Sequence, residues 1–231
     1  MLYILDTANI EKIKNCIEYY PVVGVTTNPT IISREHTDFL GIITEIRDII
    51  GPERMFHIQV TGNTCEQIVR EAHALREVIG NNLYVKIPIS KQGVKATMLL
   101  HSEGFHITET AIFTQQQALV AAKAGADFVA PYVNRLDNIV SDGVNVVHEI
   151  VELFNLYKLE SRVLAASFKN AEQVHKISLV GCHAATVSPE ILDSLIYHPL
   201  SMYAIDDFEA DWKNVYGDRM VLDLLKNDTQ G

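Results

Sequence analysis

The strongest constraint on the fold is a repeat in which a short apolar run is followed by a stretch with helical spacing. The runs are rich in β-branched and aromatic residues, and most are continuously apolar, as is typical of parallel strands covered on both faces. The repeat occurs about eight times, at intervals of roughly 20–35 residues. The predicted strands are LYILD to Asp6, VVGVTT to Thr27, FHIQV around Gln59, YVKIP around Lys86, FHITET to Thr110, DFVAPYV to Val133, RVLAASF to Phe168 and CHAATVSP to Pro189.

The stretches between these runs have apolar residues at helical spacing. Asn9 is a predicted cap of the first helix, and Gly80 is a predicted stop for the helix that follows Thr64. Further helices are predicted at about residues 38–50, 91–102, 114–124, 142–157, 170–180 and 189–196.

Strand and helix alternating in this way predict an α/β protein, a closed (β/α)8 barrel of the TIM-barrel type. A doubly wound open sheet is the alternative, and it is disfavoured because no GxGxxG follows the first strand. The chain has 231 residues, which fits one barrel over residues 1–200 and a helical extension over 201–231. Tyr203, Phe208, Trp212 and Tyr216 of the extension either pack on their own domain or contact a neighbouring subunit.

Charge and composition exclude several classes of protein. There are 19 basic and 29 acidic residues, for a net charge of −10, with no concentrated basic stretch, so a nucleic-acid partner is not expected. No apolar run reaches the roughly 18 residues that a membrane span needs, and we expect a cytoplasmic protein without a membrane partner. Three separated cysteines and nine scattered histidines lack metal-ligand spacing, so no metal site is predicted.

Polar residues end nearly every predicted strand. Chemistry in a barrel of this type lies at the carboxyl ends of the strands and in the loops that follow them. The polar residues at these ends are Asp6, Thr26, Thr27, Asn28, Gln59, Lys86, Thr110, Tyr132, Asn134, Arg135 and Ser167.

Lys86 gives the sharpest chemical signal, because it interrupts an otherwise apolar strand. A lone lysine at a strand end usually reaches outward to water. Inside a barrel it would lack that route, and desolvation would favour the neutral amine that attacks a ketone to form a Schiff base. Alternation leaves open whether Lys86 faces the barrel interior or the helix layer.

The other candidates each have an ordinary structural explanation. Asp6 is a helix cap or turn residue, or it holds substrate hydroxyls beside Lys86. Gln59 and Thr110 are satisfied core residues, or together they hold a water or a proton-donating hydroxyl. Tyr132 is a packed aromatic, or it exchanges a proton beside an iminium. Arg135 pairs with Asp137 at the surface, or it binds a phosphate together with Ser167.

With these residues in view, the chain resembles the transaldolase family over nearly its whole length, and most of all its small fructose-6-phosphate aldolase subgroup. The motifs that carry the resemblance are LDTANI, GVTTNPTII, HIQV, YVKIPIS, TETAIFTQQQAL, AGADFVAPYVNRLD, VLAASFKN and FEADW. The combination of VTTNP, VKIP and AAS at successive strand ends is highly specific, whereas any one of them alone is weak.

The resemblance implies a (β/α)8 barrel with Lys86 as Schiff-base lysine and with no metal or organic cofactor. Asp6 would contact the lysine and the substrate hydroxyls, and Thr110 would help hold a water or proton donor. The substrate-binding candidates are Thr26, Asn28, Asn134, Arg135 and Ser167, with Asn28 on the dihydroxyacetone part and Arg135 and Ser167 on the phosphate. Members of the family form rings, so a homo-oligomer, a pentamer or decamer, is implied.

Two positions separate the activities within the family. Transaldolases generally have Glu where this chain has Gln59, and Phe where it has Tyr132. The resemblance therefore implies an aldolase that cleaves or forms fructose 6-phosphate from dihydroxyacetone and glyceraldehyde 3-phosphate. The alternatives are a transaldolase, which transfers the dihydroxyacetone unit between sugar phosphates, and a phosphosugar-binding protein without turnover. Glu109 departs from the expected smaller or apolar residue, and alternation directs it toward the helix layer.

Overall fold

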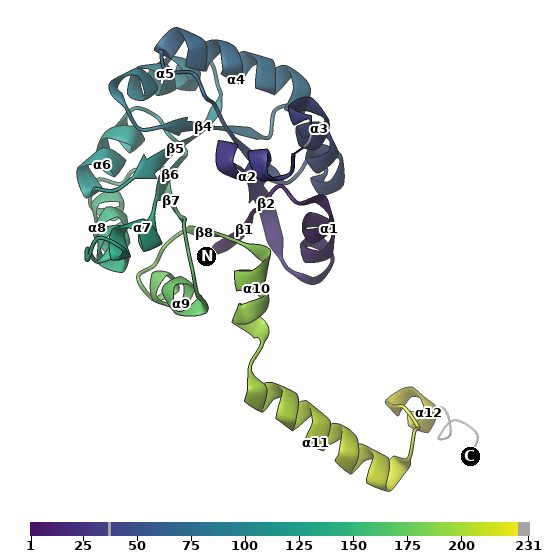
Figure 1. Cartoon of the computed structure of the whole chain (residues 1–231). Helices are drawn as coiled ribbons and strands as arrows, with labels where there is room; N and C mark the ends of the chain where they lie inside the picture. Colours follow the sequence, from purple (N-terminus) through teal and green to yellow (C-terminus); the bar gives the residue numbers. More distant parts are fainter. Residues whose placement is uncertain (37, 226–231) are drawn as a thin grey trace. The chain divides into compact units, whose positions relative to one another are not determined.

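Parallel strands close into a barrel in the order in which they follow one another along the chain (Figure 1). This computed structural model describes residues 1–36 and 38–225. The barrel strands are β1 (Leu2–Asp6), β2 (Val22–Thr26), β3 (Met55–Gln59), β4 (Leu83–Pro88), β5 (His106–Ile112), β6 (Phe128–Pro131), β7 (Arg162–Ala165) and β8 (Ala184–Val187). The predicted (β/α)8 barrel is confirmed, and the open sheet is excluded because β1 pairs with β8.

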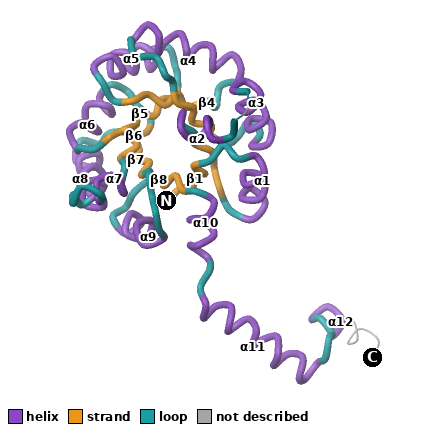
Figure 2. The backbone as a smooth tube through the Cα atoms, viewed as in Figure 1, coloured by secondary structure: helices purple, strands orange, loops and turns teal. Residues whose placement is uncertain are grey.

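Helices follow the strands and surround the ring (Figure 2). Those that belong to the barrel are α1 (Ile10–Tyr19), α2 (Pro29–Arg34), α3 (Phe39–Ile50), α4 (Cys65–Ile79), α5 (Lys91–Ser102), α6 (Gln115–Lys123), α7 (Val133–Asp137), α8 (Gly143–Leu156), α9 (Ala171–Leu179) and α10 (Pro189–Ile196). After α10 come α11 (Pro199–Tyr216) and α12 (Val221–Leu225).

The helix ends follow from local side-chain chemistry. Asn9 Oδ1 accepts a hydrogen bond from the Lys12 amide at 3.1 Å, which confirms the predicted cap of α1. Helices α4 and α6 begin with complete capping boxes. Gly80 ends α4 with a φ of 89°, a left-handed value that glycine adopts at low cost. These signals explain why the helix boundaries were predictable.

Two short helices, α2 and α7, were not predicted. Asn28 caps α2 and Pro29 is its first residue, a favoured position for proline. We predicted a strand through Val133, but β6 ends at Pro131, and Tyr132 precedes α7. Proline has no backbone N–H with which to extend the ladder, so the chain turns into a helix there. Both helices lie immediately after strands, where they place side chains over the barrel mouth.

The part of the barrel interior farther from the carboxyl ends of the strands is filled by apolar residues from several strands. Ile4, Phe128, Leu164 and Ala184 form one buried cluster, against which Tyr84 also packs. Side chains two residues further along a strand point the same way, one layer nearer the carboxyl ends. Two residues beyond Ile4, Tyr84 and Ala184, the side chains on the same face of their strands are Asp6, Lys86 and Thr186. The interior therefore becomes polar toward the mouth.

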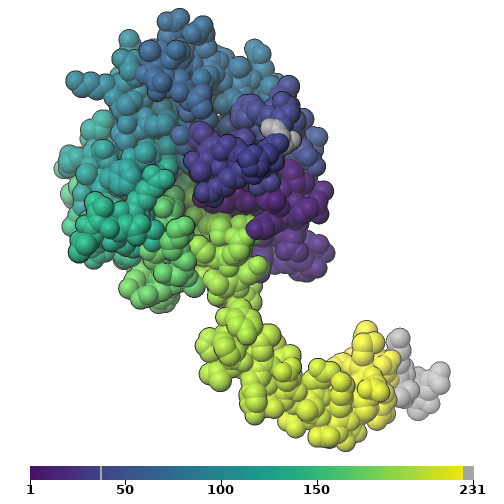
Figure 3. Space-filling model, in the orientation of Figure 1, coloured from purple at the N-terminus to yellow at the C-terminus, as the bar shows by residue number. Residues whose placement is uncertain are grey.

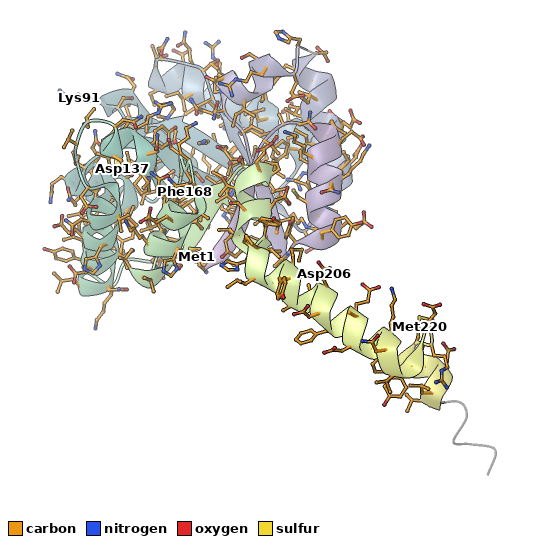
Figure 4. The ribbon with its side chains drawn as sticks, turned by 60° about the horizontal axis from the view of Figure 1, so that its bottom comes forward. Met1, Lys91, Asp137, Phe168, Asp206 and Met220 are labelled. Atoms are coloured by element: carbon orange, nitrogen blue, oxygen red, sulfur yellow. The ribbon has the colours of Figure 1, made fainter. Side chains whose placement is uncertain are left out.

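The chain divides into two compact units, Met1–Leu192 and a second unit that begins at Asp193. The predicted C-terminal helix is present as α11, and it has no buried residue. Its large exposed apolar side chains are Leu200, Met202, Tyr203, Ile205, Phe208, Val215 and Tyr216. Figure 4 draws the side chains of this helix as sticks around the label Asp206. In the part of the chain that the structure describes, no helix combines the length and apolarity needed to cross a membrane.

Candidate active site

A pocket of about 450 Å³ opens at the carboxyl ends of the strands. It brings together six residues singled out in the sequence, and these come from five of the eight repeats. They are Asp6, Asn28, Lys86, Tyr132, Arg135 and Ser167. The chain segment that contains α2 lies on the face seen in Figure 3. Residues remote in sequence thus share one cavity where a barrel of this type holds its chemistry.

Lys86 faces the pocket from β4 and is 3% exposed. Its Nζ donates a hydrogen bond to the backbone oxygen of Thr27 at 3.2 Å. This contact directs the amine across the barrel toward β2 rather than outward to bulk water. The ordinary alternative, a lysine that reaches the surface from a strand end, does not describe Lys86 in this structure. A buried amine of this kind is suited to nucleophilic chemistry.

Asp6 belongs to a hydrogen-bonded group at the base of the pocket. Thr26 Oγ1 donates to Asp6 Oδ1 at 2.8 Å and lies 2.6 Å from Thr186 Oγ1. Burial raises the pKa of Asp6, while the charge of Lys86 and the Thr26 hydrogen bond act in the opposite direction. Asn9, rather than Asp6, caps α1. Asp6 is therefore held beside Lys86 by neighbouring strands.

Tyr132 shares a hydrogen bond with Thr110, with 3.1 Å between the two hydroxyl oxygens. Thr110 is fully buried at a register shift between β5 and β6, and the next residue, Ala111, has a φ of 58°. Backbone of this kind costs energy and is frequent at functional sites. The irregular backbone of β5 therefore lies at the position where Thr110 forms its hydrogen bond with the hydroxyl of Tyr132.

Arg135 stacks on Tyr132, with its guanidinium carbon 4.7 Å from the ring centroid. Asp137, the alternative partner, instead accepts from the Gly143 amide and from Gln173 Nε2. Asp137 and Phe168, which follows Ser167, are labelled in Figure 4. The backbone N–H of Asn134 donates to the backbone carbonyl oxygen of Ser167 at 2.9 Å, which connects α7 to the loop after β7. Ser167 has a φ of 64°, in the left-handed region.

Five of the polar residues singled out in the sequence lie outside the pocket lining, and they are Thr26, Thr27, Gln59, Thr110 and Asn134. Thr26 and Thr110 do not line the pocket, but they form hydrogen bonds to two residues that do, Asp6 and Tyr132 respectively. Asn134 Oδ1 accepts from Gln173 Nε2 at 3.3 Å. Gln59 pairs with Lys86 in the strand register but lines a neighbouring apolar cavity of about 530 Å³ between α2, α3 and α4.

Sequence reasoning missed three notable pocket residues, Arg34, Lys169 and Thr186. Thr186 could have been found, because it ends the eighth apolar run as other polar residues end theirs. Lys169 follows Ser167 by two residues, in a polar segment where a lysine carries no distinguishing signal. Arg34 lies on α2, which was not predicted, so no sequence signal placed it near the site.

Two buried titratable groups lie close to the pocket without lining it. His57 stacks on Tyr84 at 4.6 Å and its Nδ1 lies 2.8 Å from Thr108 Oγ1. Burial, followed by the charges of Lys86 and His106, lowers the pKa of His57 to about 3. Glu109 faces the helix layer, as alternation predicted, and Thr97 on α5 donates to it at 2.6 Å. Burial raises the pKa of Glu109 to about 7, with the Thr97 hydrogen bond acting against this rise.

Across residues 1–36 and 38–225, no group of three or more His, Cys, Asp or Glu side chains is arranged to hold a metal ion. The pocket instead offers an amine, a carboxyl group, hydroxyls and guanidinium groups. These groups can form an imine, exchange protons and bind anions.

Comparison with known proteins places this arrangement in a family. The profile described as "Transaldolase/Fructose-6-phosphate aldolase" matches residues 3–230. The chain belongs to this family. A "Probable fructose-6-phosphate aldolase" from Streptococcus pneumoniae is 38% identical over 222 residues, which cover 96% of this chain and all of the relative. A "Probable transaldolase" from Lachnoclostridium phytofermentans is 36% identical over 218 residues, covering 94% of this chain and all of the relative.

Solved structures share the barrel of this family member at low sequence identity. Thiamine phosphate pyrophosphorylase from Pyrococcus furiosus matches with a TM-score of 0.57 and 16% identity, over 81% of this chain and 84% of its own. The 3,6-anhydro-D-galactonate cycloisomerase from Zobellia galactanivorans matches with a TM-score of 0.56 and 12% identity, over 81% and 53%. At these identities the likeness concerns the fold alone.

Proposed function

We propose that this family member is a Schiff-base aldolase that cleaves fructose 6-phosphate into dihydroxyacetone and glyceraldehyde 3-phosphate and forms it in the reverse direction. The observation that carries the proposal is the environment of Lys86, a buried amine in a pocket with Asp6 and Tyr132. The proposed mechanism uses no metal and no organic cofactor.

The first half of the reaction builds an electron sink. Lys86 Nζ, as the uncharged amine, attacks the C2 ketone of the ketose, and the resulting carbinolamine loses water to give an iminium. Asp6, which lies beside the lysine, is the proposed partner of the substrate hydroxyls. Arg135 and Ser167 are the proposed ligands of the phosphate, because a guanidinium fork and a hydroxyl both donate to phosphate oxygens.

The second half breaks the carbon chain. A proton leaves the C4 hydroxyl, the C3–C4 bond breaks, and its electron pair passes into the enamine while glyceraldehyde 3-phosphate departs. Tyr132, bonded to Thr110, is the proposed carrier that takes this proton and returns it to C3. Water then hydrolyses the iminium, which releases dihydroxyacetone and restores the amine.

Tyr132 also supports aldolase over transaldolase as the main activity. A phenol at this position supplies a proton that quenches the enamine, whereas transfer requires the enamine to survive until an aldose arrives. Gln59, a neutral amide beside Lys86 in the register, fits the same assignment. The relatives carry both names. Product analysis with fructose 6-phosphate alone, and then with an added aldose acceptor, measures the two activities separately.

Borohydride trapping tests the mechanism directly. The protein is incubated with fructose 6-phosphate or dihydroxyacetone and reduced, and the adduct is located by peptide mass. We expect modification at Lys86, none in Lys86→Met, and normal modification in Lys95→Met, whose lysine is exposed on α5. A folded wild-type protein without an adduct at Lys86 would contradict the proposal and would favour a phosphosugar-binding protein.

We further propose that the exposed apolar face of α11 packs on another copy of the chain. Leu200, Tyr203, Phe208 and Val215 are each about two-thirds exposed in the single chain. An apolar surface of this extent on a surface helix is typical of an interaction site. A pentamer or decamer is the assembly that the family resemblance implies.

A further inference from the structure

A cavity of about 900 Å³ lies at the amino-terminal ends of the strands, at the other end of the barrel from the candidate active site. Its lining includes Tyr84, Phe128 and Arg162, from the first residues of β4, β6 and β7. The chain segments that precede β6 and β7 form much of the remaining wall. A volume of this size is in the range of roughly 300–1,000 Å³ that is typical of sites for small organic ligands. We refer to it as the amino-end cavity.

The amino-end cavity carries an excess of positive charge. Three cations line it, and none forms an ion pair with a described residue; they are Lys123, Lys158 and Arg162. The carboxylate of Asp127 is already engaged, because it lies 3.2 Å from His106 Nδ1 and accepts from the Ile107 amide at 2.7 Å. Only the carboxylate of Glu160 remains to offset the three cations in this lining. This local excess occurs in a chain whose net charge is −10.

Arg162 is directed toward the centre of the barrel. It precedes Leu164 by two residues on β7, and Leu164 belongs to the buried cluster of the barrel interior. Side chains two residues apart on a strand lie on the same face of the sheet. Burial raises the pKa of Tyr84, the charge of Asp127 acts in the same direction, and the charge of Arg162 opposes them. The guanidinium therefore lies within electrostatic range of the Tyr84 phenol.

Tyr84 presents the edge of its ring to the amino-end cavity. Its ring centroid is 4.6 Å from that of His57 and 4.8 Å from that of His106, with the ring planes nearly parallel in both pairs. Strands β3 and β5, which carry the two histidines, lie on either side of β4, so the imidazoles cover opposite faces of the tyrosine. The edge that carries the hydroxyl is left to contact a ligand. A guanidinium and a hydroxyl both donate hydrogen bonds to phosphate oxygens.

The two lysines come from different elements but lie on the same side of the amino-end cavity. Lys123 is the last residue of α6, and its Nζ is 5.4 Å from the ring centroid of Tyr157, which directly precedes Lys158. Helix α8 ends at Leu156, and Lys158 has a φ of 51°. Glycine is the usual residue in this conformation after a helix, because a side chain makes it costly. A lysine at this costly position is consistent with a use for its charge.

We propose that the amino-end cavity binds a phosphomonoester of a small organic metabolite. Arg162 and the hydroxyl of Tyr84 hold the phosphate group, and Lys123 and Lys158 add positive charge beside it. The rest of the volume accommodates the organic part of the ligand. Lys86 acts at the opposite end of the barrel, so the molecule bound here is an accessory ligand and not a substrate of the proposed reaction.

Titration followed by phosphorus NMR tests this site in the Arg135→Gln background, which removes a proposed phosphate ligand of the candidate active site. The probes are glycerol 3-phosphate, adenosine 5′-monophosphate and inorganic phosphate. We expect at least one ester to bind once per chain, at least fivefold more tightly than inorganic phosphate. Adding Arg162→Gln lowers the affinity for that ester at least tenfold. Adding Arg70→Gln, which removes an exposed arginine of α4 outside both cavities, changes it less than twofold.

A second substitution separates ligand binding from a general loss of folding. Arg162→Lys keeps the positive charge without the guanidinium fork, so it is expected to bind the ester more tightly than Arg162→Gln does. Circular dichroism of each variant measures its folded structure. Ester binding that survives in folded Arg162→Gln, or inorganic phosphate that binds as tightly as both esters, would overturn the proposed site.

Discussion

At the scale of single residues, Tyr132 links the two halves of the candidate site. Its hydroxyl meets Thr110 at 3.1 Å, and Arg135 lies over its ring. The same side chain therefore contacts the proposed proton-transfer partner and the proposed phosphate ligand. The guanidinium over the ring makes a favourable cation–π contact with the phenol. A substitution at this position is expected to separate the chemical step from formation of the imine.

Tyr132→Phe removes the hydroxyl but keeps the ring beneath Arg135. We expect cleavage of fructose 6-phosphate to fall by about 100-fold or more, since general acid–base groups contribute roughly 10²–10⁴-fold. Trapping at Lys86 persists, because imine formation does not need the phenol. Steady-state rates and borohydride trapping are measured on the same preparation, with the exposed Tyr19→Phe as control. Unchanged cleavage in Tyr132→Phe would remove Tyr132 from the mechanism.

Ser167 combines a left-handed backbone with a pocket-facing position. A non-glycine residue in this conformation costs about 1–2 kcal/mol. Ser167→Gly is expected to stabilise the fold by up to about 1 kcal/mol, after the higher chain entropy of glycine is subtracted, while raising KM for fructose 6-phosphate. Ser167→Ala raises KM in the same way without the gain in stability. Urea unfolding and kinetics check both; an unchanged KM in both variants would exclude the hydroxyl as a phosphate ligand.

The residues that sequence reasoning located interrupt apolar strands or closely follow them. Lys86 within YVKIP and Asp6 after LYIL are conspicuous because polar groups in such runs need an explanation. Arg34 and Lys169 carry no such mark, since a charged residue in a polar segment is ordinary. Which surface cations turn toward the pocket depends on the path of α2 and of the loop after β7, and that path is a property of the folded chain.

At the scale of elements, the contact between β5 and α5 contains a buried carboxyl group. Glu109 is fully buried, Thr97 donates to one of its oxygens, and the other oxygen has no partner among the described residues. A buried carboxylate with one hydrogen bond is costly, so protonation relieves it. Glu109 immediately precedes Thr110, and its ionisation therefore acts on the strand that positions Tyr132.

The stability of the fold is expected to depend on this group. Burial raises the pKa of Glu109 from 4.5 to about 7, so the folded chain binds the proton more tightly than the unfolded chain. The favourable contribution of protonated Glu109 to the free energy of unfolding is fully present below pH 4.5 and is lost as the pH rises to about 7. The shift corresponds to about 3 kcal/mol.

Glu109→Gln should remove this loss of stability at rising pH, because the amide resembles the protonated acid and carries no charge. Urea unfolding at pH 5 and pH 7.5 measures the difference between wild type and variant. The exposed Glu77→Gln of α4 controls for a change in net charge. If Glu109→Gln loses as much stability as wild type between the two pH values, Glu109 does not ionise in the folded protein.

Element boundaries were predictable where a local signal ends the element. Asn9, Thr64 and Gly80 are such signals, and α1 and α4 begin or end where they predict. The short helices α2 and α7 have only six and five residues, which is too short for periodicity to indicate them. Their positions are set by Pro29 and Pro131, whose effect on the chain depends on the strand that precedes each.

At the scale of the whole molecule, the exposed apolar face of α11 is the main feature that the single chain leaves unexplained. Phe208 and Val215 lie two turns apart on this helix, and neither is buried. We expect Phe208→Asp to lower the assembly state, whereas the polar control Asp206→Asn on the same helix leaves it unchanged. Analytical ultracentrifugation gives the masses. A wild-type mass equal to the 25.9 kDa of one chain would contradict the proposed assembly.

The distribution of charge over the molecule also bears on how fast substrates arrive. The protein carries a net charge of −10, yet Arg34, Arg135 and Lys169 stand without ion-pair partners, within the described chain, around one opening. A focused positive potential of this kind raises the association rate of anions, and salt weakens it over a Debye length of about 8 Å at physiological ionic strength. Association of the proposed sugar-phosphate substrates is therefore expected to be accelerated electrostatically in dilute buffer, and its rate should decline with ionic strength more steeply as the charge of the substrate increases.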